Sequence, residues 1–226
     1  MLLPSINEIW PPIHARLAAA SEAIVDERKN DSKSLNINFK ARQALSNKTD
    51  TVHYKIRYST AAVHNLLAKL LDLTSSLCEI SKEFMCSRFE NDVWPHLVRI
   101  LQQHTYTLSS KSYHRLYNQQ RNVDEIVSIF RCIERVFSVP ECGTRLSHLV
   151  TVVGTIVLPF IGSSNRSVSD SASGVIQAIL RINSECLWFE LTRFVYESVS
   201  NDVDQSFKLQ CQALLDYADT LDEQEI

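Results

Sequence analysis

Apolar residues recur every three or four positions along most of the chain that follows position 56. An α-helix turns once in about 3.6 residues, so this spacing gathers the apolar side chains on one face of a helix. The pattern therefore predicts about eight to ten amphipathic helices and no strands. The predicted apolar faces include Val63, Leu66, Leu67, Leu70 and Leu71; Leu77, Ile80, Phe84 and Met85; Val123, Ile126, Val127, Phe130, Ile133 and Phe137; Leu146, Leu149, Val150, Val153, Val157 and Phe160; and Val175, Ile176, Ile179 and Leu180.

Two Trp-Pro steps, one at Trp94 and one at Trp10, interrupt helical patterns of this kind. Proline lacks a backbone N–H, and this loss costs little only in the first turn of a helix, where the N–H groups have no intrahelical partner. Asn91 and Asp92 are good N-cap residues, so we expect a helix to begin there and Trp94 to be buried against the preceding helix. The second proline of the other step, Pro12, predicts a kinked or late-starting first helix.

The order of capped helix, aliphatic face, polar turn and second helix repeats along the chain. Such repetition is typical of helical hairpins that stack in one direction, so the sequence predicts an all-α fold, a HEAT/armadillo-type α-solenoid of stacked antiparallel hairpins. The clearest unit spans 156 to 182, where a helix and a polar turn precede a second helix that packs Val175, Ile176 and Ile179. We expect residues 1–226 to form a single HEAT-like helical repeat domain.

A polar segment from about 21 to 55 breaks this repetition. It stands where a helical hairpin needs only a short turn, and residues 29 to 57 hold seven Lys or Arg against two Asp. A polar, charged segment of this length cannot bury enough apolar surface to fold, so we expect a largely disordered basic insertion. The whole chain has a net charge of −3, which indicates neither a nucleic-acid nor a membrane partner.

The two ends of the predicted array differ in polarity. The last helical pattern keeps Cys211, Leu214 and Leu215 on one side and polar side chains on the other, so we expect it to cap the array. The first stretch has no polar helix before it, and we expect an exposed apolar patch at this end and none at the other. The residues expected in this patch are Leu2, Leu3, Ile6, Ile9, Trp10 and Ile13. Trp188 stands in an apolar helical face, and we expect it to be buried between helices, as Trp94 is.

The chain shows no residue pattern typical of an enzyme. It contains no phosphate-binding glycine loop and no His-Glu-x-x-His sequence, so we assign no catalytic, cofactor-binding or metal-binding residue. Arg131 with Glu134, and Glu190 with Arg193, are expected to form weak ion pairs on helix surfaces because each pair stands three residues apart. The histidines expected at the surface or in hydrogen bonds are His14, His64, His96 and His148.

Six cysteines are spread along the chain without a Cys-x-x-Cys pair. We therefore expect free thiols and a reducing compartment. No apolar run reaches the roughly 18 residues that a membrane span needs, and no signal-peptide pattern precedes the first helix. The expected location is the cytoplasm, with the nucleus as a second site.

Two stretches resemble a known family more closely than the fold alone requires. The first combines LPSINEIWPPIHARL with LLAKLLDLTSSLCEISKEFMCSRFENDVWPHLVRIL, and it resembles the C-terminal part of the Tel-two-interacting protein one family. The second, LRINSECLWFELTRFVYES, resembles the closing segment of that family, where a Trp-Phe pair, here Trp188 and Phe189, opens a late helix. The positions that match in the first stretch are, in order, Cys78, Phe84, Ser87, Arg88, Phe89, Asp92, Val93 and Pro95.

The resemblance implies a non-enzymatic HEAT-repeat scaffold without cofactors. Members of the family assemble with Tel-two and a second Tti protein into the TTT co-chaperone complex. That complex works with the ninety-kilodalton heat-shock chaperone to mature the phosphoinositide-kinase-related kinases (PIKK), which act in TOR signalling and the DNA damage response. The expected partners are therefore Tel-two-like and second Tti-like subunits, these kinases and the chaperone machinery. Family members are much longer than this chain, and the resemblance identifies no individual binding residue.

Two other functions stay open. Helical solenoids also bind peptide or protein cargo as transport or trafficking adaptors, and a ladder of acidic residues along a concave groove would favour this alternative. An enzyme would require a buried polar cluster with perturbed pKa values in a deep pocket.

Overall fold

The computed structural model describes residues 3–34, 60–109, 120–197 and 205–222. These ranges are all-α and contain no strand, as the hydrophobic pattern predicts. The α-helices are α1 (Leu3–Ser34), α2 (Thr60–Ser81), α3 (Glu83–Arg88), α4 (Trp94–Ser109), α6 (Gln120–Ser138), α7 (Pro140–Arg145), α8 (Val150–Val157), α9 (Arg166–Leu180), α10 (Trp188–Glu197) and α11 (Gln205–Asp222). Within the same ranges, no helix combines the length and the apolarity that crossing a bilayer requires.

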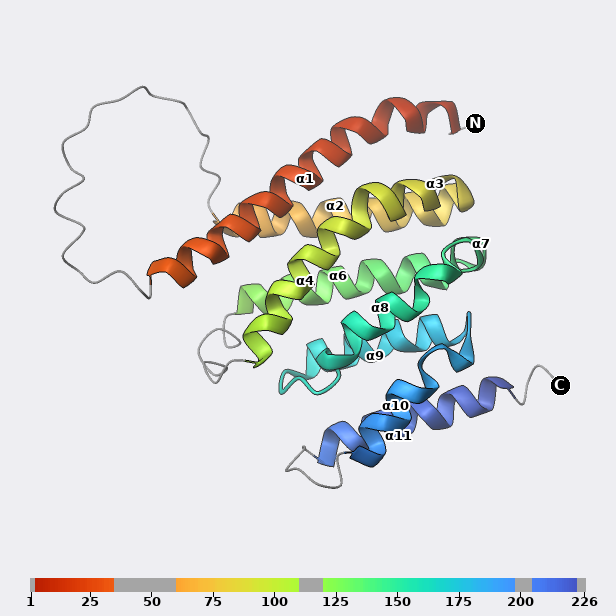
Figure 1. The fold of residues 1–226 in the computed structure, drawn as a ribbon. Helices are drawn as coiled ribbons and strands as arrows, with labels where there is room; N and C mark the ends of the chain where they lie inside the picture. Colours follow the sequence, from red (N-terminus) through yellow and green to blue (C-terminus); the bar gives the residue numbers. More distant parts are fainter. Residues whose placement is uncertain (1–2, 35–59, 110–119, 198–204, 223–226) are drawn as a thin grey trace.

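The long helices lie in two layers (Figure 1). One layer holds α2, α6, α9 and α11, and each of them contacts the next. The other layer holds α1, α4, α8 and α10, where α1 contacts α4 and α4 contacts α8. Helices of one layer run in the same direction, and helices of the other layer run back against them (Figure 1).

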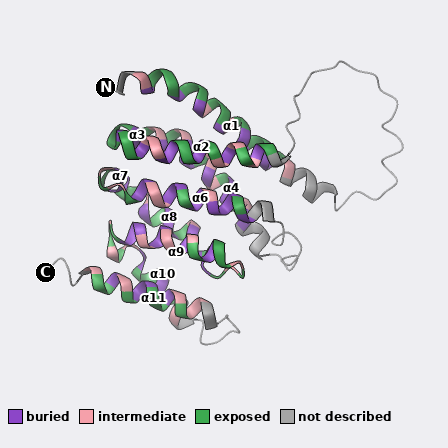
Figure 2. Cartoon of the chain, turned by 180° about the vertical axis from the view of Figure 1, so that it is seen from behind, coloured by how far each residue is buried: buried purple, intermediate pink, exposed green. Residues whose placement is uncertain are grey.

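The buried residues lie along the helices, alternating with exposed ones (Figure 2), and most of the buried side chains are apolar. Two aromatic pairs connect α6 with other parts of the core. The ring centroids of Phe137 and Phe89 are 6.4 Å apart and those of Phe130 and Phe160 are 5.2 Å apart, both edge to face. Edge-to-face pairs add stability beyond the area that they bury. The predicted faces of α2, α6, α9 and α11 lie in this core, and within α9 the side chains of Val175, Ile176 and Ile179 are fully buried.

The Trp94-Pro95 step lies inside a continuous helix, so the prediction that a helix begins at Asn91 or Asp92 is wrong. A π-helical segment, Phe89–Val93, joins α3 directly to α4, and the Trp94 N–H bonds to the Phe89 carbonyl five residues back. Pro95 has no N–H to donate, and a proline ring crowds the carbonyl four residues before it. The wider π turn relieves this conflict without ending the helix. Trp94 is 6% exposed, which confirms its predicted burial.

Helix α1 passes through Pro11 and Pro12 without interruption and extends to Ser34. It therefore does not start late, and the predicted insertion at about 21 to 55 is wrong for residues 21–34. Ile24 and Val25 are buried in the core, because they continue the apolar stripe of the preceding turns. This short apolar stripe was not recognised in the sequence because charged residues surround it. Residues 35–55 lie outside the described ranges.

Apolar side chains are exposed near both ends of the array. At the α1 end, Ile9 is exposed as predicted, but Ile6, Trp10 and Ile13 are buried in the core, so the predicted patch is wrong for these three residues. Ile80 and Phe84, which the pattern placed on an apolar core face, are exposed at this end instead. Near the other end, Trp188 is 45% exposed and Phe189 80% exposed, so the predictions that Trp188 is buried and that this end lacks an apolar patch are wrong. The two aromatic rings stand edge to face with their centroids 5.3 Å apart.

Candidate functional site

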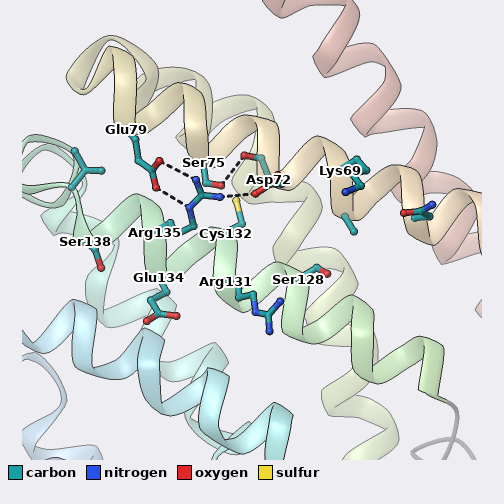
Figure 3. A pocket seen from close by; sticks show the side chains of 13 residues that line it. Lys69, Asp72, Ser75, Glu79, Ser128, Arg131, Cys132, Glu134, Arg135 and Ser138 are labelled. Atoms are coloured by element: carbon teal, nitrogen blue, oxygen red, sulfur yellow. Dashed lines mark hydrogen bonds and ion pairs between the residues drawn. The ribbon is translucent and has the colours of Figure 1, made fainter.

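A groove of about 620 Å³ lies between α2 and α6 (Figure 3). Its lining residues recur every three or four positions along both helices. They lie mostly on the polar sides of these helices. Because α2 and α6 run side by side in the same direction, these two polar faces meet along several turns. The charged and hydroxyl residues that line it are Lys69, Asp72, Ser75, Glu79, Ser128, Arg131, Glu134, Arg135 and Ser138.

Arg135 forms the central contact across the groove. Its Nε donates to Glu79 Oε1 at 2.7 Å, Nη1 donates to Asp72 Oδ1 at 2.7 Å, and Nη2 donates to Ser76 Oγ at 3.0 Å. A second bond from Nη2 to Glu79 Oε2, at 2.9 Å, completes a bidentate pair. The hydrogen bond from Arg135 lowers the pKa of the Glu79 carboxyl, and the same bond raises the pKa of the guanidinium. The charge of Arg135 is therefore already matched within the protein.

Two other cations of the groove have no ion-pair partner in the part of the chain that the structure describes. Lys69 lies on α2, and Arg131 is exposed on α6. Arg131 and Glu134 do not form the ion pair that their spacing predicts, whereas Glu190 and Arg193 lie 4.0 Å apart as predicted. The groove thus presents cationic groups that can bind an anionic group from outside.

Glu134 lies at the α9 side of the groove. A Cβ atom placed on Gly174 of α9 would come within 3.0 Å of the Glu134 carboxylate. The missing side chain at Gly174 therefore leaves the space that this carboxylate occupies. Glu134 and Arg131 stand one turn apart on α6, so a negative and a positive group alternate along this wall of the groove.

A second polar cluster lies in the core, outside the groove lining. The Glu125 side chain is fully buried, with His64 Nδ1 at 2.6 Å from Oε2 and His104 Nε2 at 3.2 Å from Oε1. The other nitrogen of His64 lies 3.7 Å from Glu27. A buried carboxylate is stable only with such partners, and these contacts join α1, α2, α4 and α6. A place for His64 at the surface or in a hydrogen bond was predicted from the sequence, whereas Glu125 and His104 were not predicted as functional or structural polar residues. A charged residue inside the apolar stripe of α6 is the signal that could have found this cluster.

The other histidines that the structure describes, and the cysteines, show no arrangement typical of catalysis. His148 Nε2 lies 2.8 Å from Glu90 Oε1 on the surface, and the His14 and His96 rings lie 6.0 Å apart. Burial, followed by the charge of His14, lowers the pKa of His96. The cysteines are free thiols, and burial raises the pKa of Cys132 to about 12. Among the described residues, no group of three or more His, Cys, Asp or Glu is placed to hold a metal ion.

No known family model, curated protein or solved structure matches the chain. Its function must therefore be inferred from the fold, the groove and the exposed side chains. The groove was not predicted from the sequence, since its residues form no motif. Two of its residues, Arg131 and Glu134, were recognised only as a surface pair.

Proposed function

We propose that this chain is a non-enzymatic scaffold of HEAT type, an α-solenoid that binds protein partners. The observation that carries the proposal is the two-layer array, in which helices of one layer run in one direction and leave a polar groove between α2 and α6. Consecutive helices alternate between the layers, as expected for hairpins stacked in one direction. Such arrays present extended surfaces for partner proteins and contact them with side chains from several repeats.

The partners that we propose are those of a TTT-like co-chaperone complex: a Tel-two-like subunit, a second Tti-like subunit and kinases of the PIKK class. The residues that carry the resemblance include fully buried ones and exposed aromatic ones. Cys78, Phe89 and Val93 are fully buried and serve the fold. Phe84 and Phe189 are exposed, and Phe189, which contacts Trp188 edge to face, still leaves 80% of its side chain open. Aromatic residues are enriched in the small groups of residues that dominate binding energy, so these two positions are the proposed contacts.

The described polar groups support binding rather than catalysis. Arg135 forms ion pairs with two carboxylates, those of Asp72 and Glu79. Glu125 lies in the core between two histidines. Burial raises the pKa of the Cys86 thiol to about 12 as well, which keeps it in the protonated, unreactive form near neutral pH.

Affinity capture from cells that express the tagged 226-residue chain tests this function. Recovery of a Tel-two-like subunit together with a PIKK kinase is the expected result, and Phe189→Ser should reduce it strongly. Val152→Ser is the matched control, because Val152 is also exposed but belongs to α8. Recovery of importin-type cargo in place of the co-chaperone subunits would contradict the proposal and favour the transport adaptor.

A further inference from the structure

We infer that the groove between α2 and α6 is a binding site for a helical segment of a partner protein that carries an acidic and a basic residue one turn apart. This inference rests on the proposed function, because it assumes a protein partner, and it names the surface and the chemistry of one contact.

The dimensions of the groove fit one face of a helix. Its lining on α2 extends from Asn65 to Glu79. At about 1.5 Å per residue, these positions span about 21 Å along the helix axis. A partner helix of about 14 residues covers the same length, and its side chains fill the volume of about 620 Å³ between the two walls.

The charges of the groove set the chemistry of the ligand. Lys69 and Arg131 are cations without an ion-pair partner among the described residues, so each can receive a carboxylate. Glu134 lies one turn from Arg131 and can receive a basic side chain. On a partner helix, residues three or four positions apart lie on the same face at about 5–6 Å, which matches this separation.

Polyanionic ligands fit the groove poorly. Asp72, Glu79 and Glu134 also line it, and Arg135 balances only part of their charge. A nucleic-acid backbone carries regularly spaced negative charge, so these carboxylates would repel it. A ligand with alternating charges gains at Lys69 and Arg131 without this repulsion.

A fluorescein-labelled peptide of sequence (EAAAK)₃ is a suitable probe, since it is largely helical and alternates charges along its length. Its binding to the whole chain is measured by fluorescence anisotropy at low salt. We expect Arg131→Glu and Lys69→Glu each to weaken binding about fivefold or more, because each change replaces an attraction by a repulsion. Arg166→Glu is the matched control: its side chain is 94% exposed on α9, outside the groove, and binding should not change.

The controls separate the possible failures. Circular dichroism must show the same helicity for all variants, which the exposure of the substituted side chains predicts. Tighter binding of the all-acidic peptide (EAAAE)₃ would overturn the inference in favour of a general anion site, and no binding of (EAAAK)₃ would overturn it outright. If affinity capture from cells succeeds, either of these peptide results leaves the scaffold proposal intact. If the capture fails while (EAAAK)₃ still binds, the scaffold proposal is contradicted and the groove inference is not.

Discussion

Replacing Trp94 by alanine should destabilise the protein much more than the same change at Trp188. Trp94 is 6% exposed. A buried large aromatic side chain removes about 150–250 Å² from water, which corresponds to about 4–6 kcal/mol at about 25 cal/mol per Å². The compactness of real unfolded chains reduces this free energy to about 3–5 kcal/mol, the usual range for such a truncation in a core.

Trp188 is 45% exposed, so it buries little more than half of its surface. The same calculation gives a loss of about 2 kcal/mol, including its edge-to-face contact with Phe189. The two variants should therefore differ by about 2 kcal/mol in free energy of unfolding, or by about 4–8 °C in melting temperature for a chain of this size.

Urea unfolding followed by far-ultraviolet circular dichroism measures this difference, because the signal does not depend on tryptophan itself. The dependence of the free energy on urea should be equal in both variants, so that the midpoints report stability directly. Phe189→Ala is the control, and its 80% exposed ring predicts a loss below about 1 kcal/mol. Equal losses at Trp94 and Trp188 would refute the assignment of Trp94 to the core and of Trp188 to the surface.

Three further outcomes are expected. Asp92→Ala should lower the free energy of unfolding by about 1–3 kcal/mol in the same urea assay. Asp92 Oδ2 accepts a 2.6 Å hydrogen bond from Trp10 Nε1, and the substitution leaves this indole N–H unpaired. An unchanged midpoint would contradict this contact. Burial and the charge of His14 lower the pKa of His96 in the folded state, so stability should be constant above the ordinary histidine pKa of about 6.5 and fall as the pH drops below it. His96→Gln should flatten this fall between pH 7 and 5, and an identical pH profile in both proteins would contradict the assignment. Cys132 should resist alkylation by iodoacetamide at pH 8 until the chain unfolds, because burial raises its pKa to about 12. Rapid alkylation of Cys132 in the native protein, detected by mass spectrometry, would contradict this prediction.

The sequence by itself determined the class of fold and a large part of the core. The apolar stripes of α2, α6, α9 and α11 could be identified because helical periodicity depends only on residues three or four positions apart. The N-cap at Asn165 is equally local, since its side chain accepts a hydrogen bond from the Val168 N–H three residues later.

The tertiary structure decided what depends on distant neighbours. Asp92 and Pro95 read as the start of a helix, but packing against α1 favours a continuous helix with a π turn, in which Asp92 bonds to Trp10. Trp188 has the spacing of a core residue, yet periodicity defines only which side of a helix is apolar and not whether a neighbour covers it.

The groove shows the same limit most clearly. A polar face that lines a binding groove has the same sequence pattern as a polar face in water. Arg135 meets Glu79 across 56 residues of chain, and this pairing arises only when α2 and α6 lie side by side. The sequence specified which residues form each helix face, because that information is local. Which faces meet, and which stay open to a partner, follows from long-range packing that no local pattern encodes.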